Sequence, residues 1–548
     1  MSPRQRYYRQ LMRGTVLLLL AATQSMSAQS TATVPASSDV YERIEAVSAW
    51  YPTRGVFLGE RPMSIRDAAR VVEALSRRIE QAAPTPRREW AQAQIRALRT
   101  ALSAASDPAR GVRWSWRTDA LGTNARVERI RPNGLGGIDT TSGEFIGIDA
   151  LRHSFDAARE GIPASAATLL VLPTVSAGGT AAAVIVEPLI ATGGARADSG
   201  RWSPAFHRAY VRGVWHNAAI RAGADEMRWG QSATGALFIS GNAAPLHALT
   251  IGTDTPVTLP WLLRHAGAFR LSGMLADLGE GFPSHARLAG WQGSIQPWST
   301  FELGVAVLSH TGGGGSPRAT FFERVVDLFP VIDALAPQHA DLQISNKIAG
   351  GNLRLRIPQL SGTDFYYELA IDDFDARRLR SSLVEDAGHL LGIRVPTFAG
   401  ARPVTWRAEW QRTSLRLYEH SQYPSGVTYH QRLIGNPLGP NAKGASLDVR
   451  IDLDAASTLE LAAADERRNP SIFLGASNDA LDHGFRFVLD SLIPDYRRQR
   501  LTASLERAMG GMTAGVVVGF ARSWQETSSR RTEWLMELRV RRDRLRTF

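Results

Sequence analysis

The sequence predicts a mainly β protein: a large transmembrane antiparallel β-barrel of about 18 strands with an N-terminal periplasmic α-helical bundle. Three observations lead to this fold class. The first part of the 548-residue chain carries apolar residues at helical spacing, and the long remainder alternates apolar with polar residues. The N-terminus has the basic and then apolar order that is typical of an exported protein.

The composition excludes several other classes of protein. Hydrophobic residues make up 44% and charged residues 21% of the chain, values outside the range of disordered proteins and of helical membrane proteins. The longest purely apolar run, Val16 to Ala22, is far shorter than the roughly 20 residues of a membrane-spanning helix. The absence of cysteine excludes disulfides and a lipoprotein anchor. The formal charge is +11, but arginine is interleaved with acidic residues, so we expect no nucleic-acid partner.

The first 28 residues are predicted to be a signal peptide. Four arginines precede the apolar run, and the small residues Ser25 to Ala28 follow it. This order of basic, apolar and small residues is that of a secretory signal. We therefore expect export, with cleavage between Ser27 and Gln29.

Residues 29–108 are predicted to form a helical head. Ser64 followed by Asp67 resembles a capping box, in which both side chains bind free N–H groups of the first turn. A second helix is predicted to begin at Pro86. Both helices have one apolar face, and such helices are expected to pack on each other and on the region that follows. The two apolar stripes are Ile65, Ala69, Val72, Leu75 and Ile79, and Ala91, Ile95, Leu98, Leu102 and Ala105.

Residues 109–548 are predicted to form the barrel. Trp406, Ala408 and Trp410, for example, alternate with charged or polar neighbours. A soluble sandwich and a membrane barrel share this alternation. Tryptophan at strand ends, the export signal, the lack of cysteine and the length of the region favour the barrel. At roughly 10 residues per tilted strand, plus turns, the region holds around 18 strands. Clusters of Gly, Pro and Ser, such as Pro173 to Thr180, are predicted to be turns.

The segment from Met227 to Thr250 carries the most distinctive motif. Trp229 and Gly230 precede a short apolar run, and a Ser-Gly-Asn sequence ending at Asn242 follows it, before Pro245 and a second apolar run. Two apolar runs separated by turn-forming residues predict a β-hairpin.

Further motifs follow the first one in the chain. They include Arg287 to Trp291, Phe365 to Phe374 with its Asp372-Asp373 pair, and Leu433 to Asn441 with Gly435 and Gly439. In this order the motifs resemble those of the capsule-assembly (Wzi-type) family of outer-membrane proteins. The resemblance implies structural or binding roles for Trp229, Gly230, Asn242, Pro245, Trp291, Asp372, Asp373, Gly435 and Gly439.

Motifs of known enzymes and metal sites are absent from the sequence. There is no HExxH, GxSxG, SxxK or phosphate-binding glycine loop, and the 12 histidines are scattered. Asp372 and Asp373 are adjacent, so in a strand they point to opposite faces and do not form an acid–base pair. We expect no catalytic residues, no metal and no cofactor.

The resemblance also implies a function. It predicts a non-enzymatic protein in the outer membrane of a Gram-negative-type cell, involved in the assembly or surface attachment of capsular or extracellular polysaccharide, with a helical head that closes the periplasmic mouth of the barrel. The expected partners are surface polysaccharide, outer-membrane lipid and the barrel-assembly machinery. Two alternatives remain open: a porin-like channel with the same charged lumen, and an outer-membrane hydrolase.

Overall fold

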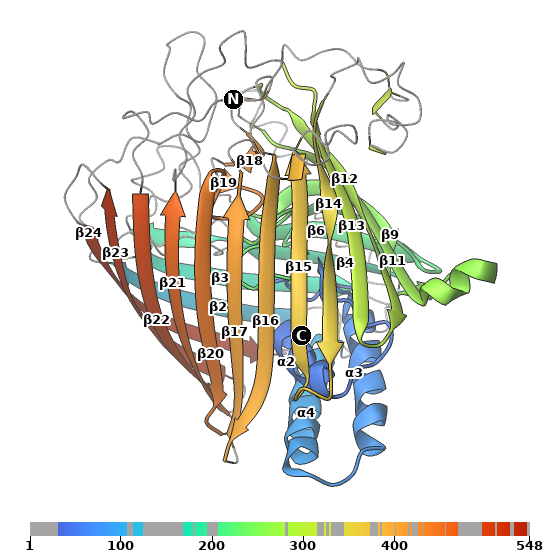
Figure 1. Ribbon diagram of the computed structural model, residues 1–548, viewed down its shortest axis with the longest axis vertical. Coiled ribbons are helices and arrows are strands. Elements are labelled where there is room, and N and C mark those ends of the chain that lie inside the picture. Colours follow the sequence, from blue (N-terminus) through green and yellow to red (C-terminus); the bar gives the residue numbers. More distant parts are fainter. Residues whose placement is uncertain are drawn as a thin grey trace.

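The computed structural model is a closed antiparallel β-barrel with α-helices at one end, partly inside the barrel mouth (Figure 1). This confirms the predicted fold class. The structure describes residues 31–106, 113–123, 168–178, 181–193, 206–279, 283–314, 345–372, 386–400, 402–414, 426–430, 432–454, 456–468, 496–509, 512–525 and 531–544, with a few shorter pieces between them. The predicted signal peptide, 1–28, lies outside the described residues.

The described helices are α2 (Asp39–Trp50), α3 (Ile65–Glu80), α4 (Pro86–Ser106) and the 3-10 helix η2 (Trp261–Ala266). The strands of the barrel are β2 (Arg113–Thr123), β3 (Thr168–Gly178), β4 (Ala182–Pro188), β5 (Ile190–Gly193), β6 (Phe206–Trp215), β7 (Ala218–Asp225), β9 (Leu246–Thr253), β10 (Val257–Thr258), β11 (Ala268–Asp277), β12 (Arg287–Trp298), β13 (Phe301–Thr311), β14 (Ser345–Ile357), β15 (Thr363–Asp372), β16 (Ala387–Ala399), β17 (Arg402–Thr413), β20 (Ala442–Asp452), β21 (Ser457–Arg468), β22 (Tyr496–Met509), β23 (Met512–Gln525) and β24 (Arg531–Arg544). Two small sheets pair β1 (Glu60–Arg61) with β8 (Arg228–Trp229), and β18 (Thr428–Tyr429) with β19 (Arg432–Leu433).

The barrel strands follow one another around the sheet in chain order. β2 closes the ring, because Trp116 pairs with Arg542 of β24 on one side and with Pro173 of β3 on the other. β4 and β5 form one interrupted strand beside β3, as β9 and β10 do beside β11. The 20 segments of the sheet therefore make 18 strands within the described part of the chain, in agreement with the predicted number.

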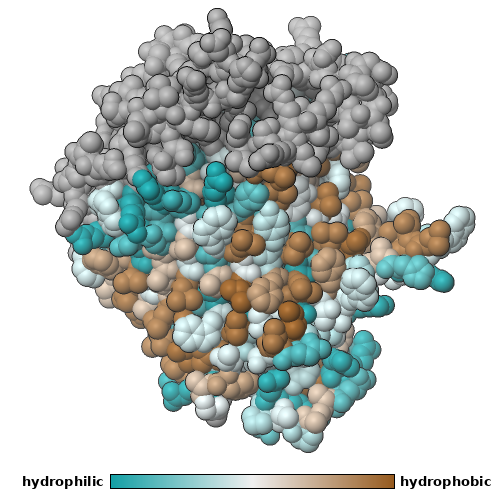
Figure 2. All heavy atoms as spheres, viewed as in Figure 1, coloured by the Kyte–Doolittle hydropathy of each residue, from teal (hydrophilic) through white to brown (hydrophobic). Residues whose placement is uncertain are grey.

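The two faces of the barrel wall differ as the alternation predicts. Trp406, Trp410 and Met536 are 45%, 44% and 65% exposed on the outside, whereas Glu409 and Glu537 are buried inside. Figure 2 shows the resulting apolar surface over the strands. An apolar outer face and a charged lumen define a transmembrane barrel, because the outer side chains meet lipid and the backbone groups pair within the closed sheet.

One predicted turn is wrong. Pro173 to Gly178, within the cluster expected to be a turn, belong to β3. β3 pairs with β2 along nearly its whole length, and Pro173 is opposite Trp116. Pairing between distant segments decides the structure here, and local composition does not report it.

The helices of the head begin where the sequence predicts. The Ser64 side chain caps α3 by accepting from the backbone N–H of Asp67 at 3.1 Å. The Asp67 carboxylate does not complete the predicted capping box; it accepts from Arg70 at 2.9 Å and from Arg270 of β11 at 2.7 Å. Ala69, expected on the buried stripe, is exposed, and Ala68 is buried in its place. No helix in the described ranges is long and apolar enough to cross a membrane.

The head packs on the inner wall of the barrel. The apolar faces of α2, α3 and α4 share one core with Ala183, Ile185 and Tyr210 of β4 and β6. At the other side, Trp50 of α2 stacks on Phe398 of β16 with 5.2 Å between the ring centroids. The head is thus anchored to the wall by apolar contacts on two sides.

The packing of α3 gives a first prediction. Val72 is 2% exposed, so Val72→Asp buries an unpaired charge, at a cost of several kcal/mol. Limited proteolysis should then cleave the head, while the barrel keeps the faster electrophoretic migration of an unheated sample. Ala69→Asp, on the exposed side of the same helix, is the matched control and should behave as wild type. Equal protease resistance of both variants would contradict the packing.

Candidate functional site

The predicted hairpin from Met227 to Thr250 is the largest departure from the sequence prediction. After β7 the chain turns into the barrel, and residues 226–245, here called the lumen segment, are mostly buried there before β9 begins. Trp229 makes a bridge to Ile239, and Gly230 donates its N–H to the carbonyl of Gly59 at 2.9 Å. The hairpin prediction was therefore wrong, because its second apolar run forms β9, which pairs with β7 and β11 in the wall and not with the first apolar run.

Three glutamates of the barrel wall bind the lumen segment and the chain beside it. Glu302 of β13, Glu368 of β15 and Glu409 of β17 are at most 3% exposed and point into the barrel. Because each carboxylate accepts several hydrogen bonds from main-chain N–H groups, we call them the amide-binding glutamates. Hydrogen bonds to a charged acceptor are about twice as strong as neutral ones.

Each of these carboxylates has its own set of donors. Glu302 accepts from the N–H groups of Leu58 (3.1 Å) and Gly59 (2.9 Å). Glu368 accepts from those of Gln231 (2.6 Å), Ser232 (2.7 Å) and Leu237 (2.9 Å). Glu409 accepts from those of Ala233 (2.9 Å) and Thr234 (3.2 Å), and from the hydroxyl groups of Ser232 (2.9 Å) and Tyr366 (2.6 Å).

A second internal segment, residues 432–441, packs on the lumen segment. Asn436 donates from Nδ2 to the carbonyl of Gly235 at 2.8 Å and to Oε1 of Gln411 at 2.6 Å. Leu237 and Phe238 share an apolar core with Leu433 and other residues of the lumen. The lumen thus contains a folded core of its own.

Several predicted site residues meet in this core. Trp229 is 3% exposed and pairs with Glu60 of β1. Asn242 donates from Nδ2 to the carbonyl of Leu433 at 2.9 Å. Pro245 is buried directly before β9.

The three glycines among the predicted residues occupy positions that disfavour a side chain. A Cβ on Gly230, where φ is +142°, would lie 2.6 Å from Oε2 of Glu368. One on Gly435 would lie 2.5 Å from the ring of Tyr418. Gly439 has a φ of +73° and its carbonyl accepts from the hydroxyl of Thr413. These positions require glycine for space or for backbone conformation.

The remaining predicted residues do not all join the core. Asp372, at the end of β15, is buried and accepts from the N–H of Tyr418 at 2.7 Å, and burial raises the pKa of the Tyr418 hydroxyl. Asp373 lies outside the described residues. Trp291 is half-buried on β12, where its indole N–H donates to the carbonyl of Leu328 at 2.7 Å and its ring stacks on Phe329. Trp291 is therefore apart from the lumen core.

Ion pairs fix the head to the same wall. Glu45 of α2 accepts from Arg354 of β14 at 2.6 Å and from Arg407 of β17 at 2.7 Å. Burial opposes ionisation of Glu45, but the two guanidinium groups outweigh it and hold the carboxyl pKa well below its ordinary value. On the opposite side, Asp254 accepts from Arg66 of the head at 3.2 Å and from Arg212 of β6 at 2.8 Å.

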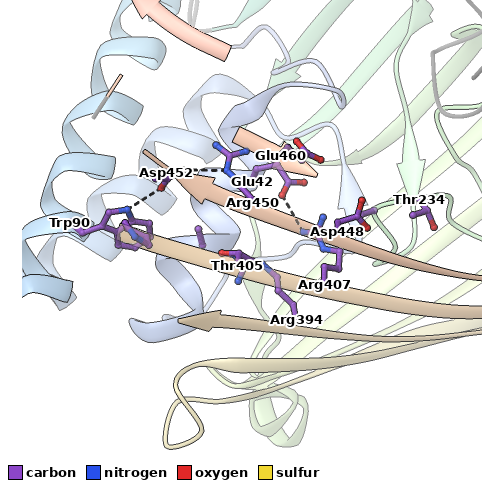
Figure 3. Close-up of a pocket in the computed structure, with 13 residues that line it drawn as sticks. Glu42, Trp90, Thr234, Arg394, Thr405, Arg407, Asp448, Arg450, Asp452 and Glu460 are labelled. Atoms are coloured by element: carbon purple, nitrogen blue, oxygen red, sulfur yellow. Dashed lines mark hydrogen bonds and ion pairs between the residues drawn. The ribbon is translucent and has the colours of Figure 1, made fainter. Parts of the chain in front are cut away.

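A cavity of about 200 Å³ lies between the head and the wall (Figure 3). Glu42 and Arg407 pair across it at 3.1 Å, and Trp90 donates its indole N–H to Asp452 at 3.1 Å. Its other polar side chains are Thr234, Arg394, Thr405, Asp448, Arg450 and Glu460. This mixture of donors and acceptors suits the hydroxyl groups of a polar molecule. Among the described residues, no group of three or more His, Asp or Glu side chains is arranged to hold a metal ion.

Sequence reasoning missed the roles of the amide-binding glutamates and of Asn436. The alternation places charged residues in the lumen, and Glu409 lies in a strand recognised in that way. The sequence therefore shows that such a carboxylate occupies an inward position of a strand. It does not show which segment of the chain the carboxylate faces.

Taken together, the geometry defines a transmembrane β-barrel whose lumen holds an internal folded core and a docked helical head. Residues 175–533 match the profile of the family described as capsule assembly protein Wzi. The match covers more than half of the chain, and the chain belongs to this family. No curated protein sequence matches the chain.

One solved structure shares the fold with a TM-score above 0.5. Wzi of Escherichia coli, described as an outer-membrane protein involved in group 1 capsule assembly and as a carbohydrate-binding β-barrel, is 14% identical, with a TM-score of 0.66 over 92% of this chain and 99% of that one. OccAB1 of Acinetobacter baumannii is 8% identical, with a TM-score of 0.41 over 79% and 97% of the two chains. OpdQ of Pseudomonas aeruginosa is 7% identical, with a TM-score of 0.41 over 79% and 98%.

Replacement of Glu368 tests the role of the amide-binding glutamates. Oε1 of Glu368 accepts two main-chain N–H groups and Oε2 accepts a third, so the NH₂ group of Glu368→Gln must face at least one donor. Each lost bond to a charged group costs about 1.5–3 kcal/mol. We expect the lumen segment to loosen and the conductance in planar bilayers to rise. Glu460 is an exposed carboxylate that lines the cavity. The control variant Glu460→Gln should therefore leave the conductance trace unchanged. Identical traces for both variants would contradict the role.

The depressed pKa of Glu45 predicts a pH dependence. A carboxylate with a lowered folded-state pKa contributes its full stabilisation above the ordinary value of 4.5, and loses it as the pH falls toward the folded-state pKa. Wild type should therefore resist proteolysis of the head better than Glu45→Gln at neutral pH, and this difference should shrink on acidification below 4.5. A difference that stays constant across this range would show that Glu45 does not hold the head by its charge.

Proposed function

We propose that this protein acts at the outer membrane, without catalysis, in the assembly or attachment of polysaccharide at the cell surface. Membership of the capsule-assembly family supports this proposal, and the related E. coli protein is described as carbohydrate-binding. The observation that carries it is the occupied lumen. A barrel whose interior is bound to its wall through Glu302, Glu368 and Glu409 is suited to hold a ligand at its surface.

The placement of the parts belongs to the same proposal. The 1–28 segment directs export, residues 29–108 form a head on the periplasmic side, and residues 109–548 form the barrel, which the barrel-assembly machinery inserts into lipid. The contacts of α2 with Arg354 and Arg407 support a head that stays docked. The predicted motif residues Trp229, Gly230, Asn242, Gly435 and Gly439 then act by holding the lumen core in place.

The second candidate function is a porin-like channel. The charged inner wall and the 200 Å³ cavity beside Arg407 and Asp448 favour it, because a channel needs a polar path. The buried lumen segment weighs against it. A channel conducts ions through an open lumen, whereas a barrel with a filled lumen does not. Measured conductance therefore separates the two functions.

Two measurements on one purified sample test the proposal. In planar bilayers the protein should be nearly silent, and when immobilised in detergent it should bind extracellular polysaccharide from the producing cell without releasing sugars. A strain lacking the protein should lose polysaccharide from its surface into the medium. Steady ohmic conductance without polysaccharide binding would establish the channel instead, and release of sugars would establish a hydrolase.

A further inference from the structure

The helix η2 is an apolar protrusion on the outside of the barrel. It lies between β10 and β11, and its residues Trp261, Leu262 and Leu263 are 89%, 84% and 60% exposed. In Figure 1 it is the short green helix that projects sideways from the barrel at the right. Figure 2 shows apolar spheres on the upper side of this protrusion and polar ones below.

The base of the protrusion is fixed to the wall. Gly267 follows η2 with a φ of +77°, and it bridges to Gln296 of β12. A Cβ at this position would lie 2.0 Å from the carbonyl oxygen of Gln296, so the backbones touch here as only glycine permits. The N–H of Gly267 also closes the helix by donating to the carbonyl of Arg264 at 3.1 Å. The direction of η2 is therefore set by packing at its base.

The surroundings of η2 favour lipid as its partner. Leu271 and Leu275 of β11 are 41% and 44% exposed on the lipid-facing side of the wall, and Trp298 of β12, beside the base, is 62% exposed. The protrusion continues this apolar surface away from the barrel. From Thr255 to Gly267 the chain has no acidic residue, while Arg264 and His265 are exposed. Apolar side chains beside basic ones, with tryptophan among them, are typical of segments that lie in a membrane interface.

We propose that η2 is an interfacial anchor that inserts Trp261, Leu262 and Leu263 into the phospholipid leaflet beside the barrel, with Arg264 near the headgroup phosphates. The anchor widens the footprint of the barrel on one side only. It therefore resists rotation and tilting of the barrel relative to the membrane. This role is independent of the proposed function in polysaccharide attachment.

The absence of cysteine makes a direct test possible, because one introduced cysteine is the only labelling site. A nitroxide spin label is attached to Leu262→Cys in the full-length protein in nanodiscs of phosphatidylethanolamine and phosphatidylglycerol. Leu275→Cys on the barrel wall provides the lipid reference, and Gln81→Cys in the exposed turn after α3 provides the water reference. Heat-dependent migration shows that each variant is folded.

The ratio of oxygen to nickel-chelate accessibility decides the outcome. At position 262 this ratio should be several-fold above that at position 81 and close to that at position 275. Leu263→Cys should give the same ratio. It replaces Leu262→Cys as the labelling site if Leu262→Cys does not fold. A ratio at both positions equal to that at position 81 would place η2 in water and overturn the proposal, leaving a soluble protein as the occupant of this surface.

Discussion

The structure depends on hydrogen bonds between wall carboxylates and main-chain N–H groups inside the barrel. A chain that crosses a barrel lumen outside the sheet leaves its backbone groups without ladder partners, and an unpaired buried N–H costs about as much as a lost hydrogen bond. Glu302, Glu368 and Glu409 lie on three neighbouring hairpins of the wall and supply the missing acceptors. The lumen segment can therefore be irregular, buried and ordered at the same time.

The same arrangement joins the three parts of the molecule. Glu302 binds Leu58 and Gly59 of the head region and also accepts from the side chain of Gln231 in the lumen segment at 2.9 Å. Arg354 donates to Gln231 at 2.8 Å and to Glu45 of α2 at 2.6 Å. A substitution of one of these side chains therefore alters hydrogen bonds of the wall, the head and the lumen core together. Such coupling is expected of a connected polar network in a low-dielectric interior.

The sequence predicts the wall well and the interior poorly, for a physical reason. Alternation along a strand is local, so Trp406 and Glu409 could be assigned to opposite faces without knowledge of their neighbours. The helices of the head were found for the same reason, from the cap at Ser64 and the spacing of Val72 and Leu75. By contrast, the donor Gln231 and the acceptor Glu368 are 137 residues apart, and no local pattern connects them.

The hairpin expected from Met227 to Thr250 illustrates this limit. Its turn-forming residues were recognised correctly as places where the chain bends. The side chain of Asn242, however, donates to the carbonyl of Leu433 in another segment of the lumen and does not close a hairpin. Family resemblance selected Gly230 and Gly435 as important positions, and the contacts of each explain why a side chain does not fit there. The resemblance grouped Trp291 with the residues of the lumen core. In the structure Trp291 instead lies on the outer part of the wall with Phe329.

Hydrogen–deuterium exchange of the purified wild-type protein in nanodiscs tests the central claim most directly. The main-chain N–H groups of Gln231, Ser232 and Leu237 belong to no strand, yet each is bound by Glu368. If the amide-binding glutamates hold the lumen core, peptides covering this stretch exchange as slowly as those of β15 in the wall. Exchange as fast as that of the exposed turn between α3 and α4 would show that the lumen segment is not held, and would contradict the account.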